Sequence, residues 1–143
     1  MLVKLNDVLK NTVFEDYAIP AFNIYGYEDA KAVIDAAQTI NAPVIIATNS
    51  TAISNTPIEI LGKMLTTMAE KASVPVVVHL DHGKDYKTIA QALHAGYSSV
   101  MYDGASLPFD DNVKATKEIV KLAHAYEIPV EAEIGTIGSS DPN

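Results

Sequence analysis

Apolar runs and amphipathic stretches alternate along the chain. The run VPVVVHL, which starts at Val74, is short, apolar and β-branched, as expected of a buried strand. The stretch YEDAKAVIDAAQTIN, which starts at Tyr27, instead repeats its apolar residues at helical spacing. Read in this way, the chain has predicted strands over 18–24, 43–48, 74–80, 98–102 and 129–134, and predicted helices over 27–41, 56–72, 85–96 and 109–127.

This repeated strand–helix order predicts a parallel α/β sheet with right-handed crossovers, and we expect its helices on one side. Two architectures fit, an open doubly wound sheet and a closed TIM (β/α)8 barrel. A nucleotide-binding open sheet usually has a glycine-rich first turn, but the first turn here, FNIYGYED, contains one glycine. A barrel predicts polar residues at the carboxyl ends of its strands, and every predicted strand has one. The pattern favours the barrel. The chain supplies about four and a half βα units, whereas a complete barrel takes roughly 250 residues.

Composition narrows the classes of function. The 143 residues are 48% hydrophobic and 20% charged, which is typical of one globular domain. A formal net charge of -8 argues against a nucleic-acid surface, since such surfaces are usually basic. The absence of cysteine excludes disulfides and thiolate metal sites and favours a cytoplasmic setting. The N-terminal stretch lacks the apolar core of a signal peptide, and no apolar run reaches membrane-spanning length.

The segment HLDHG ends the third predicted strand with three polar groups, His79, Asp81 and His82. An apolar parallel strand is normally buried on both faces, so imidazoles at its end point to a site. His79 and Asp81 share a face by strand alternation. His82 has the opposite parity and joins them only if the strand is interrupted, which Gly83 makes feasible. The alternative is a pair of surface histidines at a strand end.

Other strand ends carry oxygen ligands. Asp103 ends VMYDG, Glu131 and Glu133 share one face of VEAEIG, and Asn23 ends PAFN. Taken singly, these residues fit an Asp-Gly turn, a solvated edge strand and ordinary turn chemistry equally well. Taken together, an imidazole and several carboxylates favour a metal site, with zinc preferred by the imidazole. Such a metal could polarise a carbonyl or activate water, and composition does not separate these two chemistries.

Five segments, in order, carry a family resemblance: PAFN, NAPVII, VPVVVHLDHG, AGYSSVMYDGASLPFDDN and LAHAYEIPVEAEIG. They resemble the class II, metal-dependent ketose-bisphosphate aldolases, which include fructose- and tagatose-bisphosphate enzymes. The resemblance implies that 1–143 is a single partial domain, the N-terminal half of a TIM barrel. It also implies zinc as cofactor, a phosphorylated ketose as substrate, and a homo-oligomer in the full-length form. The implied reaction is reversible aldol cleavage to dihydroxyacetone phosphate and glyceraldehyde 3-phosphate.

The resemblance also implies roles for individual residues. Asp81 matches the acid that exchanges a proton with the aldehyde or hydroxyl oxygen during carbon–carbon cleavage. His82 matches a zinc-ligating histidine. Asp103 and Glu133 match carboxylates of an alternative metal position, and Asn23 matches a residue near the substrate.

Two positions depart from the family pattern. Asp141, in GSSDPN, stands where the family usually has a mobile-loop glutamate implicated in proton transfer at carbon, and it is one methylene shorter. Asn49, in TNSTA, stands where a substrate-contacting hydroxyl is expected.

Length is a further departure, because family members are about twice as long, as a complete barrel requires. The family's other two histidine ligands lie in the second half. The sequence therefore predicts no appreciable activity for this chain alone. Two alternatives stay open at this point: a non-catalytic half-barrel or interaction fragment, and a metal-dependent TIM-barrel hydrolase.

Overall fold

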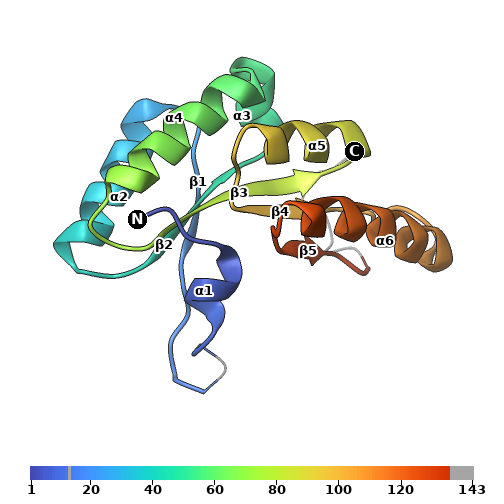
Figure 1. Ribbon diagram of the computed structural model, residues 1–143, viewed down its shortest axis with the longest axis horizontal. Coiled ribbons are helices and arrows are strands. Elements are labelled where there is room, and N and C mark those ends of the chain that lie inside the picture. The colour runs from blue at the N-terminus through green and yellow to red at the C-terminus, as the bar shows by residue number, and fades with distance from the viewer. Residues whose placement is uncertain (13, 136–143) are drawn as a thin grey trace, which may run out of the picture.

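The computed structural model describes residues 1–12 and 14–135, which form one five-stranded sheet (Figure 1). Every neighbouring pair of strands is parallel, and the order is β1-β2-β3-β4-β5. The strands are β1 (Ala21–Asn23), β2 (Val44–Thr48), β3 (Val76–Gly83), β4 (Ser99–Tyr102) and β5 (Val130–Ala132). The predicted parallel run is thus confirmed. The first and last strands are shorter than predicted, and β3 continues to Gly83.

Six helices lie in the described part of the chain. They are α1 (Leu5–Leu9), α2 (Tyr27–Thr39), α3 (Ser50–Asn55), α4 (Ile58–Lys71), α5 (Tyr86–His94) and α6 (Phe109–Ala125). The four long helices are those that the apolar spacing predicts. The two short ones, α1 and α3, were not predicted.

The main core lies between the sheet and the four long helices. Alternate strand residues such as Ile46 and Val78 point into it and are fully buried, as is Leu65 of α4. We call this face of the sheet the outer face, because in a barrel the helices surround the strands. Helix α5 ends before Gly96, whose φ of +92° is the left-handed conformation that glycine adopts readily at such a position.

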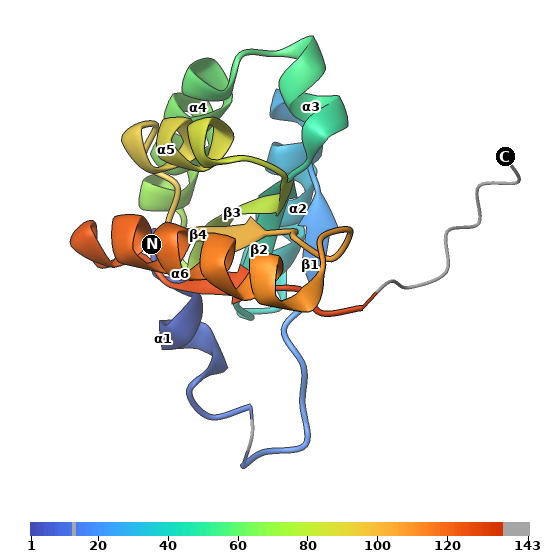
Figure 2. The same cartoon turned by 90° about the vertical axis from the view of Figure 1, so that its right-hand side faces the viewer.

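Helix α1 lies on the opposite face of the sheet, so the prediction that all helices pack on one side is wrong for this element. Val8 of α1 packs against Ile45 and Val77, whose side chains alternate with those of the outer face. Figure 2 shows α1 and α4 on opposite sides of the strands. We call this second face the inner face. Helix α1 therefore helps to cover the apolar pair Ile45 and Val77 on that face.

Candidate active site at the carboxyl ends of the strands

The end of β3 contains a register shift that decides where His82 points. Leu80 pairs with Val100 and Gly83 pairs with Tyr102. Three steps along β3 therefore correspond to two steps along β4. This is the pattern of a β-bulge, and His82 has a left-handed φ of 51° within it. The extra residue reverses the face of the sheet to which the following side chains of β3 point. It accounts for how His82 reaches neighbouring strand ends although it follows Asp81 directly.

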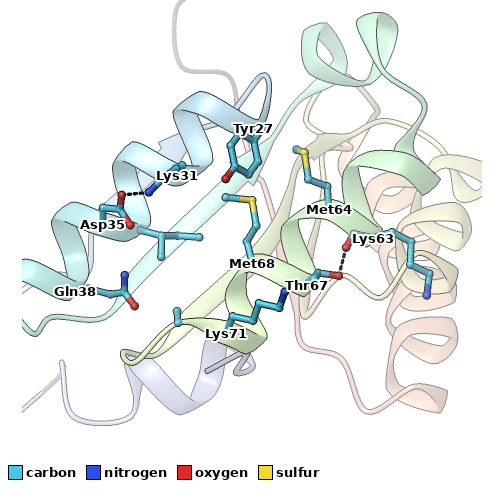
Figure 3. Close-up of a pocket in the computed structure, with 11 residues that line it drawn as sticks. Tyr27, Lys31, Asp35, Gln38, Lys63, Met64, Thr67, Met68 and Lys71 are labelled. Atoms are coloured by element: carbon cyan, nitrogen blue, oxygen red, sulfur yellow. Dashed lines mark hydrogen bonds and ion pairs between the residues drawn. The ribbon is translucent and has the colours of Figure 1, made fainter.

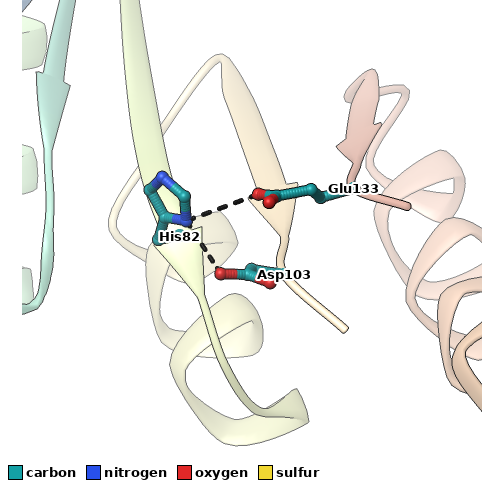
Figure 4. A group of neighbouring side chains, drawn as sticks. All are labelled: His82, Asp103 and Glu133. Atoms are coloured by element: carbon teal, nitrogen blue, oxygen red, sulfur yellow. Dashed lines mark hydrogen bonds and ion pairs between the residues drawn. The ribbon is translucent and has the colours of Figure 1, made fainter. Parts of the chain in front are cut away.

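His82, Asp103 and Glu133 come together from three adjacent strand ends (Figure 4). The Nδ1 atom of His82 lies 2.8 Å from an Asp103 carboxylate oxygen and 3.7 Å from one of Glu133. One candidate ligand atom from each residue falls within 4.8 Å of the other two. An imidazole nitrogen with two carboxylate oxygens is a donor set that suits zinc or another divalent transition metal. The residues present therefore fit the metal that the sequence predicts.

The electrostatics of the cluster centre on Asp103, which is buried at 7% exposure. Burial opposes ionisation of Asp103, but hydrogen bonds from Lys84, His82 and the Ala105 amide outweigh it and hold the pKa at about 2. Asp103 is consequently a carboxylate, so Nδ1 of His82 carries the hydrogen that it donates. That hydrogen bond in turn raises the pKa of His82, with the charges of Asp81, Asp103 and Glu133 acting in the same direction.

Asp81 lies beside this cluster and also faces the inner side of the sheet. One of its carboxylate oxygens is 3.8 Å from Nε2 of His82. Asp81, Asn23, His79 and Glu131 all border a cavity of about 180 Å³ on the inner face. The structure thus brings Asn23 and Asp81 to one cavity, with the His82 cluster at its edge.

His79 is buried in the wall of that cavity. Its Nδ1 lies 2.8 Å from the Ser99 hydroxyl, and its Nε2 lies 3.6 Å from a Glu131 carboxylate oxygen. Burial lowers the pKa of His79 to about 4, against an attraction from Asp81 that raises it. The imidazole is therefore neutral near pH 7. Burial raises the pKa of Glu131, and the charge of Asp81 adds to this increase.

Three residues that shape the site were not among the sequence-based candidates. Lys84 contacts Asp103 directly, and Ser99 holds His79. Asn112 of α6, which is buried, donates from its side-chain amide to the backbone oxygen of Glu133 over 2.8 Å. A charged loop residue, a strand serine and a helical asparagine carry no distinctive pattern, so only their placement identifies them.

Of the two remaining sequence candidates, one lies outside this cluster and its cavity. Asn49 is the N-cap of α3, and its side-chain oxygen accepts a hydrogen bond of 3.2 Å from the Ala52 amide. This contact gives Asn49 a local structural role, and a substrate contact stays a prediction. Asp141 lies outside the described residues, so its predicted role is likewise untested.

A separate groove of about 560 Å³ lies on the helical side, between α2 and α4 (Figure 3). Its lining includes Lys31, Asp35, Met64, Met68 and Lys71, and Lys31 pairs with Asp35. All of its lining residues belong to or adjoin these two helices, so it is not part of the site at the strand ends.

None of the helices in residues 1–12 and 14–135 has the length and hydrophobicity that a membrane-spanning helix needs.

Comparison with known proteins places these features in a family. Residues 3–143 match the family model described as fructose-bisphosphate aldolase class-II. A fructose-bisphosphate aldolase of Mycoplasma pneumoniae is 39% identical over 99% of this chain, which covers 50% of that relative. A 6-phospho-5-dehydro-2-deoxy-D-gluconate aldolase of Bacillus licheniformis is 41% identical over 97% of this chain, which covers 49% of that relative.

Solved structures agree with the sequence matches. The YdjI aldolase of Escherichia coli K12 superimposes with a TM-score of 0.90 and 38% identity, covering 94% of this chain and 51% of that one. This chain therefore spans about half the length of the relatives it matches, and its sheet supplies five strands of an eight-stranded TIM barrel. The family match and the shared fold establish that this chain belongs to the class II fructose-bisphosphate aldolase family.

Proposed function

We propose that the barrel to which these residues contribute is a zinc-dependent ketose-bisphosphate aldolase. It would cleave fructose or tagatose 1,6-bisphosphate to dihydroxyacetone phosphate and glyceraldehyde 3-phosphate. The observation that carries the proposal is the convergence of His82, Asp103 and Glu133 beside Asp81 at the strand ends of a class II aldolase chain. Family membership favours aldol cleavage over the hydrolase alternative. In this proposal the full-length enzyme is a cytoplasmic homo-oligomer.

His82 would hold the zinc ion, with Asp103 and Glu133 providing an alternative position for it. A bound zinc ion would supply a Lewis acid for a carbonyl oxygen. Asn23, at the cavity that Asp81 borders, would hold a substrate hydroxyl, and Asn49 and Asp141 would take the substrate-contact and carbon-protonation roles that the resemblance implies.

Asp81 would exchange the proton of the cleavage step. In the cleavage direction its carboxylate takes the proton of the substrate hydroxyl, and the adjacent carbon–carbon bond breaks. The electron pair of that bond stays with the ketone fragment, and the former hydroxyl carbon leaves as the aldehyde. The side chain of Asp81 is 25% exposed and opens into the inner cavity, so a substrate oxygen can approach it.

The test is a completed barrel, made by joining residues 1–143 to the second half of the M. pneumoniae relative. We expect zinc-dependent release of triose phosphate, detected with a coupled dehydrogenase and abolished by a chelator. Asp81→Ala should lower turnover by on the order of 10²–10⁴ with a smaller effect on substrate binding. Asp110→Ala, an exposed acid at the start of α6, is the matched control and should leave turnover unchanged. Full activity of Asp81→Ala would remove Asp81 from the mechanism.

We further propose that residues 1–143 alone have no appreciable aldolase activity. Catalytic zinc normally keeps three protein ligands and one open position, and His82 is the single histidine in the candidate metal cluster of the described residues. The same coupled assay on the 143-residue chain with added zinc tests this. Chelator-sensitive turnover in the ordinary enzymatic range would show that the half-barrel suffices.

A further inference from the structure

We infer that Lys84 is a built-in competitor for the metal site: a divalent cation must displace the Lys84 ammonium group from Asp103 before it binds there. The inference rests on the metal position of the proposed function. It concerns how tightly that position holds a cation.

Both carboxylate oxygens of Asp103 are already engaged. Its Oδ1 accepts a hydrogen bond of 3.1 Å from the Ala105 amide. Its Oδ2 accepts from Nδ1 of His82 over 2.8 Å and from the Lys84 ammonium group. A carboxylate oxygen offers about two lone-pair directions, so Oδ2 is saturated by these two donors. A cation that takes this oxygen has to replace one of them.

Of the two donors on Oδ2, Lys84 is the one that a metal must remove outright. His82 can stay in place by giving up its Nδ1 hydrogen and turning from donor to ligand, since metal ligands bind in their deprotonated form. The ammonium group has no lone pair to offer while it is charged. It would also repel a divalent cation at contact distance. Lys84 must therefore leave Oδ2 of Asp103, the oxygen that faces His82, when the cation takes that oxygen.

The structure lets Lys84 leave without disturbing the fold. The Lys84 side chain is 62% exposed, whereas the Asp103 side chain is 7% exposed. The ammonium group thus reaches a buried acid from the solvent side, on a flexible four-carbon stem. Its release returns it to water while Asp103, His82 and the strand ends stay where they are.

Removing the ammonium group should therefore strengthen metal binding. Without it, the buried Asp103 carboxylate keeps its charge but loses its exposed cationic partner. A contact of this kind is worth on the order of 1 kcal/mol, which corresponds to roughly a five- to tenfold change in a dissociation constant.

The experiment titrates the 143-residue protein with Co²⁺, followed by its absorption bands, and with Zn²⁺ against a chromophoric chelator. Lys84→Met should bind both ions about five- to tenfold more tightly than the wild type. Lys87→Met is the matched control, because Lys87 is an exposed lysine of α5 nearby in sequence and carries the same charge change. Its affinity should stay within about twofold of the wild type, since an exposed charge away from the site is screened by solvent. Lys84→Arg keeps the charge and should behave like the wild type.

A second measurement follows Lys84 directly. In protein with ¹⁵N-labelled lysine side chains, Zn²⁺ should shift one Nζ resonance, and that resonance should be missing from Lys84→Met. Equal affinities of Lys84→Met and Lys87→Met, or an unmoved Lys84 resonance at full zinc occupancy, would overturn the inference and leave the metal site standing. If Asp103→Asn and the wild type bind zinc equally, the metal position itself is wrong, and the inference fails with it.

Discussion

At the scale of single residues, the buried imidazole of His79 lines the cavity on the inner face. His79 is 5% exposed and sits between the Ser99 hydroxyl and the Glu131 carboxylate. When the Ser99 hydroxyl donates to Nδ1, the neutral ring carries its hydrogen on Nε2. That hydrogen faces the Glu131 carboxylate, so no imidazole lone pair faces the carboxylate oxygens. In this arrangement Nε2 of His79 faces Glu131 at 3.6 Å, beside the cavity that Asp81 and Asn23 share.

The neutrality of His79 predicts a dependence of stability on pH. The pKa of His79 falls from 6.5 in the unfolded chain to about 4 in the folded protein. Between these values the unfolded chain binds a proton that the folded chain does not, so the free energy of unfolding decreases as the pH is lowered from about 6.5 to about 4. This group should contribute a loss of about 3 kcal/mol over that range.

Urea unfolding of the wild type and His79→Gln at several pH values isolates this contribution. The raised pKa values of His82 and Glu131 act with the opposite sign, but both groups are present in both proteins. We therefore expect the free energy of unfolding of the wild type to fall relative to that of His79→Gln as the pH is lowered toward 4. Parallel curves for the two proteins would show that His79 is not held neutral.

At the scale of elements, the register shift of β3 and the glycine beside it place His82. A Cβ atom on Gly83 would lie 2.8 Å from the backbone oxygen of Met101 and 2.7 Å from Cδ1 of Ile89. The Gly83 backbone oxygen also accepts a hydrogen bond of 2.9 Å from the Asp103 amide. The close approach of β3 to β4 therefore needs glycine at this position. This close approach brings Asp103 within reach of His82.

Gly83→Ala should consequently destabilise the protein by about 1–3 kcal/mol, as overpacking against backbone does, and weaken Co²⁺ binding by moving β3 away from Asp103. Gly26→Ala is the control, since the nearest atom to its added Cβ would be 3.8 Å away. Gly26→Ala should lower the free energy of unfolding by less than about 1 kcal/mol, which is the difference expected between glycine and alanine at an N-cap. Urea unfolding and metal titration of both variants measure these effects. Equal costs for the two alanines would contradict the packing argument.

The pattern of apolar residues predicted the long helices and the five strands, and it failed for the two short helices. The long helices could be predicted because their apolar residues recur at helical spacing over many residues. The strands could be predicted because short apolar runs alternate with those helices. Helix α1 spans five residues and α3 spans six, too few for a periodic signal. Helix α1 is instead held on the inner face by Val8, a contact distant in sequence from Ile45 and Val77.

The candidate site could likewise be predicted from the sequence only in part. Polar residues at strand ends could be predicted, because parallel strands bring their carboxyl ends to one edge of a sheet. The partners of those residues could not: Lys84, Ser99 and Asn112 act through contacts that depend on how neighbouring strands and helices pack. Gly83 suggested an interruption of β3, but the one-residue shift and the φ of His82 are properties of the paired strands.

At the scale of the whole molecule, the sheet has two edges. Strand β1 pairs with β2 alone and β5 with β4 alone among the described strands. Beside β1, a mostly apolar groove of about 520 Å³ runs along α2, with Phe22 and Ile40 in its lining. Phe22 is 47% exposed and Ile40 is 74% exposed. An unpaired strand next to an apolar groove is a ready surface for association, because both backbone hydrogen bonds and apolar burial are available there.

The last prediction is that the 143-residue polypeptide on its own self-associates through this edge. Sedimentation equilibrium should give an average mass that rises with concentration. Phe22→Glu should shift the protein toward monomer by roughly tenfold or more in dissociation constant, since burial of a large apolar side chain contributes about 1.5–3 kcal/mol. Phe14→Glu is the matched control, because Phe14 is 86% exposed and lies outside the groove. It should leave the association unchanged. A monomeric wild type, or equal effects of the two substitutions, would show that the β1 edge is not the contact surface.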